Sequence, residues 1–210
     1  MEFLPKITPT GYKPHQIFQD EIQSLLESKG FDIIQFTYHD LLQPDQISRL
    51  GRNNSLAALY IRTHTDLLGV AYGDRYSCLV EIKSSENKRF RNMSIEAYPF
   101  GVNSILSRLC GVDIYYFWKD FITDKSIGFY AGTHPKVDRI IIPKWRWSVE
   151  EIDSWKTILS GLFQEVPVMV KPTGRYGSGD PMVIILESEI ELLPSPDAVL
   201  DSIMEKIGTN

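Results

Sequence analysis

The sequence predicts an α/β fold whose elements follow the order helix, strand, strand, strand, helix, strand. Apolar residues recur at helical spacing in residues 14–29 and 94–109, and runs of β-branched and aromatic residues fill the segments around them. A Gly-Asp turn at Gly73 and Asp74 separates two such runs. We expect one domain over residues 1–210, with a core at about 14–118 and an α+β extension at about 119–210.

The composition indicates a globular protein inside the cell. With 210 residues, 43% of them hydrophobic, the chain can bury a sizeable core. It contains no apolar run of ~18 residues and no secretory signal, so we expect a cytoplasmic protein with no membrane partner. Cys78 and Cys110 are too few for a disulfide framework, and we expect two reduced core thiols. The net charge of −5 argues against an extended nucleic-acid surface, so any such contact should be local.

The first helix is expected over residues 14–29, with Pro14 in its first turn and Gly30 just past its end. Glu21 lies four residues after Ile17 and four before Leu25, which places it on the inward stripe. A carboxylate there needs a partner. A lysine or a backbone amide would suffice, in which case Glu21 is only a boundary residue. A strand over residues 31–38 follows.

The hairpin predicted over residues 61–85 is the central feature of the chain. Counting outward from its turn places Asp66 opposite Glu81. Because strand side chains alternate, Glu81 and Lys83 share one face of the sheet, whereas Val80 and Ile82 point into a core.

Two opposed carboxylates need an explanation. At ~5 Å and an effective dielectric of ~20 they repel by about 3 kcal/mol. Mg²⁺ or Mn²⁺, which prefer carboxylate, carbonyl and water oxygens, would offset this repulsion, with Lys83 beside the ion. Two alternatives need no metal: an edge strand whose acidic side chains are merely solvated, or an ion-paired cluster in which Lys83 neutralises Asp66 and Glu81.

A second helix is expected over residues 94–109, with Pro99 in its first turn. Glu96 and Asn103 could approach the hairpin from this helix, although Glu96 could instead only cap it. The strand that follows, over residues 112–118, is almost entirely apolar or aromatic, so we expect it to be central in the sheet.

Two segments carry basic residues. The long connection over residues 39–59 includes Arg52, and the segment just after the hairpin contains Lys88, Arg89 and Arg91. These four side chains are the candidates for contact with a phosphodiester backbone. They could equally be solvated loop residues.

Asp66 and the tripeptide Glu81-Ile82-Lys83, in this order of elements, resemble the PD-(D/E)XK nuclease superfamily, although Thr65 replaces the proline that precedes the Asp in its motif. The resemblance implies the αβββαβ core of restriction endonucleases, a mixed central sheet flanked by helices. It further implies that Asp66, Glu81 and the backbone carbonyl of Ile82 bind the metal, and that Lys83 orients or helps to deprotonate the attacking water. The layout is similar to that of archaeal Holliday-junction resolvases. Because many members of the superfamily carry a metal-binding Glu on the first helix, Glu21 is a secondary candidate ligand.

The extension adds short strands over residues 127–131, 139–142, 166–171 and 182–186. Ser148 and Glu151 form a capping box for a helix reaching about Gln164. We expect the aromatic residues just before it, Trp145 and Trp147, to pack in the core. A last helix begins near Pro196, and its apolar stripe either covers the core or pairs with a second subunit.

Two hypotheses for the function follow. The first is a Mg²⁺- or Mn²⁺-dependent endonuclease that hydrolyses DNA; the resemblance implies a homodimer, a branched DNA substrate and a role in recombination or repair. The second is a catalytically inactive protein of nuclease fold that binds DNA or supports an assembly. The net charge of −5 and the C-terminal apolar stripe favour the second.

Overall fold

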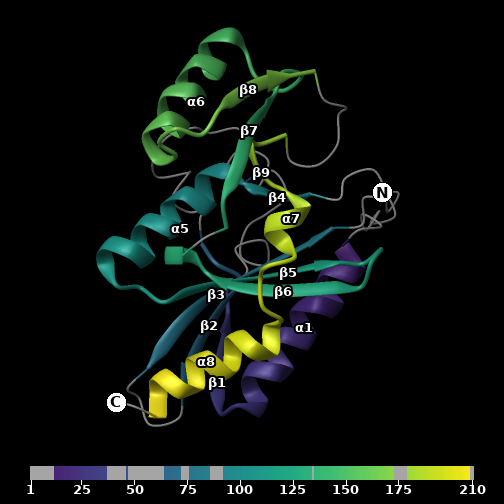
Figure 1. The fold of residues 1–210 in the computed structure, drawn as a ribbon, viewed down its shortest axis with the longest axis vertical. Coiled ribbons are helices and arrows are strands. Elements are labelled where there is room, and N and C mark those ends of the chain that lie inside the picture. Colours follow the sequence, from purple (N-terminus) through teal and green to yellow (C-terminus); the bar gives the residue numbers. More distant parts are fainter. Residues whose placement is uncertain are drawn as a thin grey trace, which may run out of the picture.

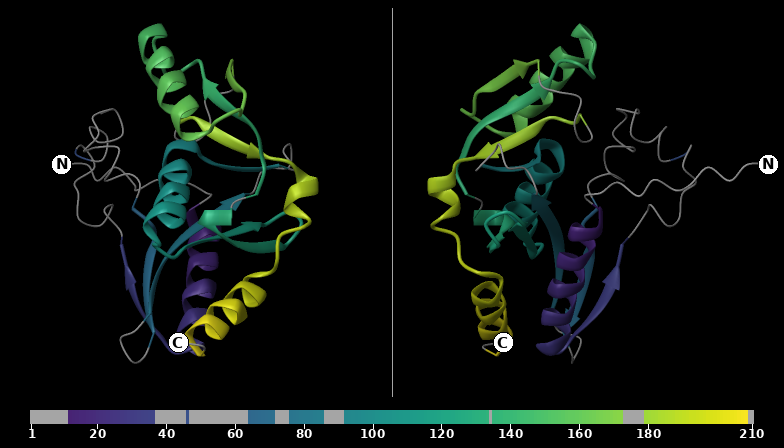
Figure 2. Two further views of the ribbon diagram at one scale, coloured as in Figure 1. Left: turned by 60° about the vertical axis from the view of Figure 1, so that its left-hand side comes forward. Right: turned by 90° about the vertical axis from the view of Figure 1, so that its right-hand side faces the viewer.

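The computed structural model describes residues 12–36, 46, 64–71, 76–85, 92–133, 135–172 and 179–208. The elements run in the order α1 (Tyr12–Ser28), β1 (Phe31–Gln35), β2 (Leu67–Ala71), β3 (Ser77–Ser85), β4 (Met93–Glu96), α5 (Ala97–Cys110), β5 (Ile114–Asp120), β6 (Lys125–Tyr130), a 3₁₀ turn (Ala131–Thr133), β7 (Val137–Pro143), α6 (Val149–Leu162), β8 (Val168–Lys171), β9 (Met182–Ile185), α7 (Glu187–Ile190) and α8 (Pro196–Gly208). α1 and α8 lie at one end of the molecule and α6 with β8 at the other (Figure 1). Figure 2 shows α5 at mid-height between these ends.

The larger sheet is mixed, as the sequence predicts. Its strand order is β1-β2-β3-β5-β6, in which β3 and β5 are parallel and the other neighbours antiparallel. β5 lies inside this sheet, which confirms the expectation from its apolar sequence. β3 lies at the centre, so the alternative of a solvated edge strand is wrong. Helices cover both faces of the sheet, and the predicted fold class is confirmed.

The predicted register of the hairpin is also confirmed. β2 and β3 pair from Leu67 with Val80 to Val70 with Ser77. Continuing this antiparallel ladder by one pair places Asp66 opposite Glu81. The turn at Gly73 and Asp74 lies outside the described residues.

Alternation along β3 divides its side chains between two hydrophobic clusters. Val80 and Ile82 pack with buried residues of α1 and α8, such as Phe18 and Leu200. Glu81 occupies the opposite face, where its neighbour on β5 is Tyr116. That face is covered by α5, and it carries the polar residues of the site.

The last helix covers the core. Val199, Leu200 and Ile203 of α8 are buried in the same cluster as α1. The close approach of α8 to β6 is possible because residue 128 is a glycine. A Cβ built there would lie 2.9 Å from atoms of both Phe117 and Val199.

The second sheet has the order β4-β9-β7-β8 and packs with α5 and α6. Its first strand is a correction to the sequence analysis: residues 93–96 form β4, paired with β9, and the helix begins only at Ala97. β4 lies within the predicted core segment, yet it belongs to the sheet formed by the extension. The capping box of α6 is present, with Ser148 and Glu151 satisfying each other's backbone amides.

The structure also tests the predicted burial of Trp147 and of the two cysteines. Trp147 is buried and its indole N–H donates to the Gly179 carbonyl at 2.9 Å, so this tryptophan packs as expected. Cys78 is buried, but Cys110 is exposed at the end of α5, so the expectation of two core thiols is wrong for Cys110. Within the described segments, the helices are too short or too polar to cross a membrane.

Candidate active site

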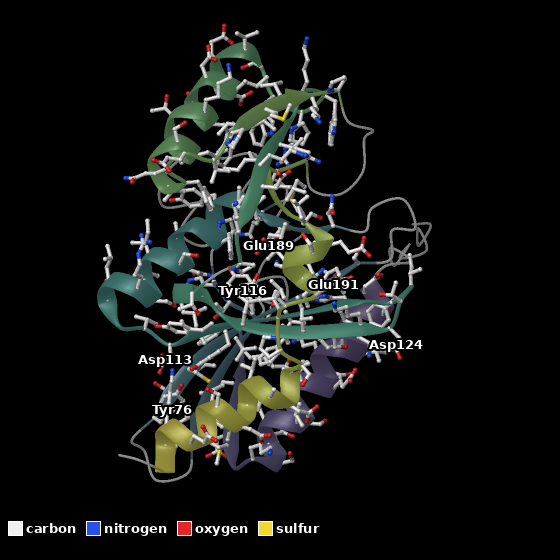
Figure 3. The ribbon with its side chains drawn as sticks, viewed as in Figure 1. Tyr76, Asp113, Tyr116, Asp124, Glu189 and Glu191 are labelled. Atoms are coloured by element: carbon white, nitrogen blue, oxygen red, sulfur yellow. The ribbon has the colours of Figure 1, made fainter. Side chains whose placement is uncertain are left out.

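The candidate site lies where β3 leaves its antiparallel partner and runs on beside β5. β2 begins at Leu67, so Asp66 sits just outside the ladder, while β3 continues to Ser85. β4 ends at Glu96, directly before α5, which brings a third carboxylate toward Lys83. Tyr116, labelled in Figure 3 near the middle of the molecule, is the neighbour of Glu81 in the adjacent strand β5.

Asp66 is fixed by backbone contacts on both sides. Its Oδ2 accepts a hydrogen bond from the Ile82 N–H at 2.6 Å. Its carbonyl accepts another from the Phe36 N–H at 2.8 Å. The Asp66 carboxylate is therefore held against the peptide that follows Glu81. The N–H and C=O of one strand residue point toward the same edge, so the Ile82 carbonyl is directed to the same side as Asp66.

Glu81 is a buried carboxylate that is only partly satisfied. The residue is 4% exposed. One oxygen, Oε1, accepts from the Lys83 ammonium at 2.7 Å. The other, Oε2, is buried without a hydrogen-bond partner among the described residues. Burial raises the pKa of this carboxyl to about 8, and the charges of Asp66 and Glu96 act in the same direction.

Lys83 links two carboxylates. Its Nζ lies 2.7 Å from Glu81 Oε1 and 3.2 Å from Glu96 Oε2. Burial alone would lower the pKa of the ammonium, but the surrounding carboxylates outweigh this and raise it well above its ordinary value. The charge of Lys83 in turn lowers the pKa of Glu96. Lys83 therefore stays positively charged and serves as the counter-ion of the cluster.

The structure places two further side chains at the site, those of His15 and Asn103. His15, near the start of α1, has its Nδ1 3.4 Å from Ser84 Oγ, and burial lowers its pKa despite the opposing charges of Asp66 and Glu96. Asn103 of α5 donates from Nδ2 to the Tyr116 hydroxyl at 2.9 Å, and both side chains are buried. The sequence singled out Asn103 by its helix but carried no signal for His15.

Glu21 is a correction. The buried stripe of α1 is centred on Phe18, Ile22 and Leu26, whereas Ile17 is 53% exposed. Because Glu21 follows Ile17 by one turn, it shares the solvent-facing side. Its carboxylate pairs with Lys119 at 3.0 Å. Glu21 is therefore not grouped with Asp66 and Glu81.

The remaining predicted contacts cannot be placed. Arg52, Lys88, Arg89 and Arg91 lie outside the described residues.

The donor set of the site suits a hard divalent cation, although it is sparse. Across the described ranges, His, Cys, Asp and Glu side chains form no group of three or more that could hold a metal ion. Two carboxylates, Asp66 and Glu81, and a backbone carbonyl are within the ligand number that Mg²⁺ accepts, since it usually retains several waters. The unpartnered Oε2 of Glu81 is the specific feature that fits a cation, because a buried carboxylate oxygen left without a partner is costly.

Comparison with known proteins finds similarity in structure but none in sequence. No model of a known protein family matches the chain, and no curated protein matches its sequence. Among solved structures, the chain is similar to Hjc, a Holliday junction resolvase from the archaeal hyperthermophile Archaeoglobus fulgidus. The two share 12% sequence identity over 88% of this chain and 98% of that chain, with a TM-score of 0.44. This degree of likeness says nothing about activity, which has to be inferred from the side chains of the site.

Proposed function

We propose that this protein is a divalent-metal-dependent phosphodiesterase that hydrolyses DNA. The single observation that carries the proposal is the Glu81 carboxylate, buried opposite Asp66 with one oxygen on Lys83 and the other without a partner. An acidic pair beside a charged lysine combines the groups needed to hold a cation and to stabilise a phosphoryl anion.

Each group has a distinct role in this proposal. Asp66, Glu81 and the Ile82 carbonyl would hold Mg²⁺ or Mn²⁺. The bound cation supplies Lewis acidity toward a phosphoryl oxygen and lowers the pKa of coordinated water. Lys83 donates hydrogen bonds to the attacking water and to the oxygen on which negative charge develops. The Ile82 N–H keeps the Asp66 carboxylate in place.

The finer part of the proposal concerns the substrate and the assembly. The resemblance of Asp66 and Glu81-Ile82-Lys83 to the superfamily motif supports this part. It points to DNA as the substrate, branched DNA in particular, to a role in recombination or repair, and to a homodimer. The net charge of −5 makes local phosphate contacts, rather than a broad basic surface, the expected mode of binding.

Thermal unfolding with and without Mn²⁺ tests the metal site. A cation bound only by the folded chain at 100 times its dissociation constant should stabilise the fold by about 2.7 kcal/mol. Asp66→Asn, which is nearly isosteric, should abolish this gain, whereas Glu191→Gln, on an exposed carboxylate, should retain it. An equal response in parent and Asp66→Asn would remove Asp66 from the site.

Cleavage of four-way-junction, flap and linear DNA in Mn²⁺ then tests the activity. Lys83→Met should cleave much more slowly than the parent. Undiminished cleavage by this variant would exclude Lys83 from the reaction.

A second candidate function has its own supporting observation. The 2.7 Å contact between Lys83 and Glu81 already neutralises part of the acidic cluster, as expected for a nuclease fold that binds DNA or supports an assembly without catalysis. Under that reading the parent chain should show no Mn²⁺-dependent stabilisation and no cleavage, while still binding DNA or a partner.

A further inference from the structure

We propose that Glu96 is a positioning residue, which holds the Lys83 ammonium in place when the Glu81 carboxylate binds a divalent cation. The inference rests on the proposed function and extends it to a residue outside the two-carboxylate set. Glu96 would thereby allow Lys83 to bond to Glu81 without metal and to serve the reaction with metal.

The geometry supports a handover between two carboxylates. The Lys83 Nζ lies within 3.2 Å of oxygens from both Glu81 and Glu96. A lysine ammonium has three donors, so it can bond to both carboxylates at once and release one without losing the other. The ammonium stands between the two acids, so Glu96 faces the positive charge of Lys83.

Glu96 is well anchored for this task. It is the last residue of β4 and pairs with Met182 of β9. The next residue, Ala97, is fully buried, and its N–H donates to the Pro181 carbonyl at 2.8 Å. The Glu96 side chain makes no capping hydrogen bond to α5, so the alternative that Glu96 only caps this helix does not explain its position.

The proposed cation and Lys83 compete for Glu81. An ion bound at the free Oε2 of Glu81 would repel the ammonium held on Oε1, because both carry positive charge. Without a second acceptor, Lys83 would either oppose metal binding or turn away from the site. Glu96 prevents both outcomes. A direct-ligand role for Glu96 is less consistent with the structure, because the described acidic and histidine side chains form no group of three that could hold an ion.

A double-mutant cycle on Mn²⁺ affinity tests this inference. The dissociation constant is measured from the free-Mn²⁺ paramagnetic resonance signal for the parent, Glu96→Gln, Lys83→Met and the double variant. Glu96→Gln should weaken binding by about tenfold when Lys83 is present, as expected for loss of a charge-assisted hydrogen bond. In the Lys83→Met background the same substitution should change affinity by less than about twofold.

The alternatives give different cycles. If Glu96 is itself a ligand, Glu96→Gln weakens binding strongly in both backgrounds. If it contributes only a distant charge, the same modest factor appears in both. Either result overturns the positioning role while leaving the metal site intact. A parent chain that binds no Mn²⁺ refutes the proposed function, and the inference with it.

Kinetics provide a second readout. At saturating Mn²⁺, Glu96→Gln should lower kcat for DNA cleavage and leave KM nearly unchanged, because a misplaced Lys83 impairs the reaction rather than DNA binding. Glu191→Gln is the matched control and should affect neither constant. An unchanged kcat for Glu96→Gln would contradict the role assigned to Glu96.

Discussion

Replacing Glu81 by glutamine should change how the stability of the metal-free protein depends on pH. The carboxyl is buried, and burial together with Asp66 and Glu96 raises its pKa from 4.5 to about 8. Glutamine keeps the size of the side chain and removes the ionisation. The comparison of parent and Glu81→Gln therefore isolates one titrating group.

The sign follows from proton binding. Below pH 4.5 the Glu81 carboxyl carries its proton in both the folded and the unfolded chain, and its ionisation does not reduce the free energy of unfolding. Between pH 4.5 and 8 the unfolded chain has released the proton while the folded chain retains it, so the unfolding free energy falls as pH rises. At ~1.4 kcal/mol per pKa unit, the loss over this window reaches up to ~5 kcal/mol.

Urea unfolding in a chelator at half-unit steps from pH 5 to 9 measures this effect. The parent should lose stability relative to Glu81→Gln across the window, and the difference should level off above pH 8. Glu191→Gln should follow the parent curve. Parallel curves for parent and Glu81→Gln would refute the reasoning, because they would mean that Glu81 ionises in the folded chain as it does in water.

Three other substitutions test the stability of the fold, one beside the site and two away from it. Tyr116→Phe should cost about 1–3 kcal/mol in urea unfolding because it leaves the buried Asn103 amide without its acceptor, and adding Asn103→Leu should recover much of this loss. Gly128→Ala should lower stability by about 1–3 kcal/mol in the same measurement, since its Cβ would lie 2.9 Å from Phe117; an unchanged midpoint would show that α8 shifts freely. Ser148→Ala should lower the free energy of unfolding by about 1 kcal/mol through loss of the α6 cap. An unchanged free energy of unfolding in urea would contradict this.

The part of the fold that could be predicted from sequence is the part governed by local pattern. Alternation along β3 and the position of the turn determine which residues face each other, so the sequence alone predicts that Asp66 lies opposite Glu81, in line with the observed ladder. The capping box of α6 is likewise a local signal, and both of its hydrogen bonds are present.

Features that depend on distant partners were missed. β4 is four residues long and becomes a strand only by pairing with β9, almost 90 residues later, so its own sequence resembled the start of a helix. The spacing of Ile17 and Leu25 predicts an inward Glu21, but the rotation of α1 is set by the buried Phe18, Ile22 and Leu26, which leaves Ile17 and Glu21 facing solvent. His15 approaches Ser84 through that same packing, which no local pattern reveals.

The pairing of β4 with β9 makes the two halves of the chain chemically interdependent. Glu96 pairs with Met182, and the N–H of the next residue, Ala97, donates to the Pro181 carbonyl, so a carboxylate from the first half of the chain is held in place by residues of the second half. In a chain truncated before β9, the Glu96 carboxylate would no longer be held near Lys83, even if the five strands of the larger sheet still formed. Substitutions in the second sheet should consequently change the position of Glu96 and, through it, the properties of Lys83.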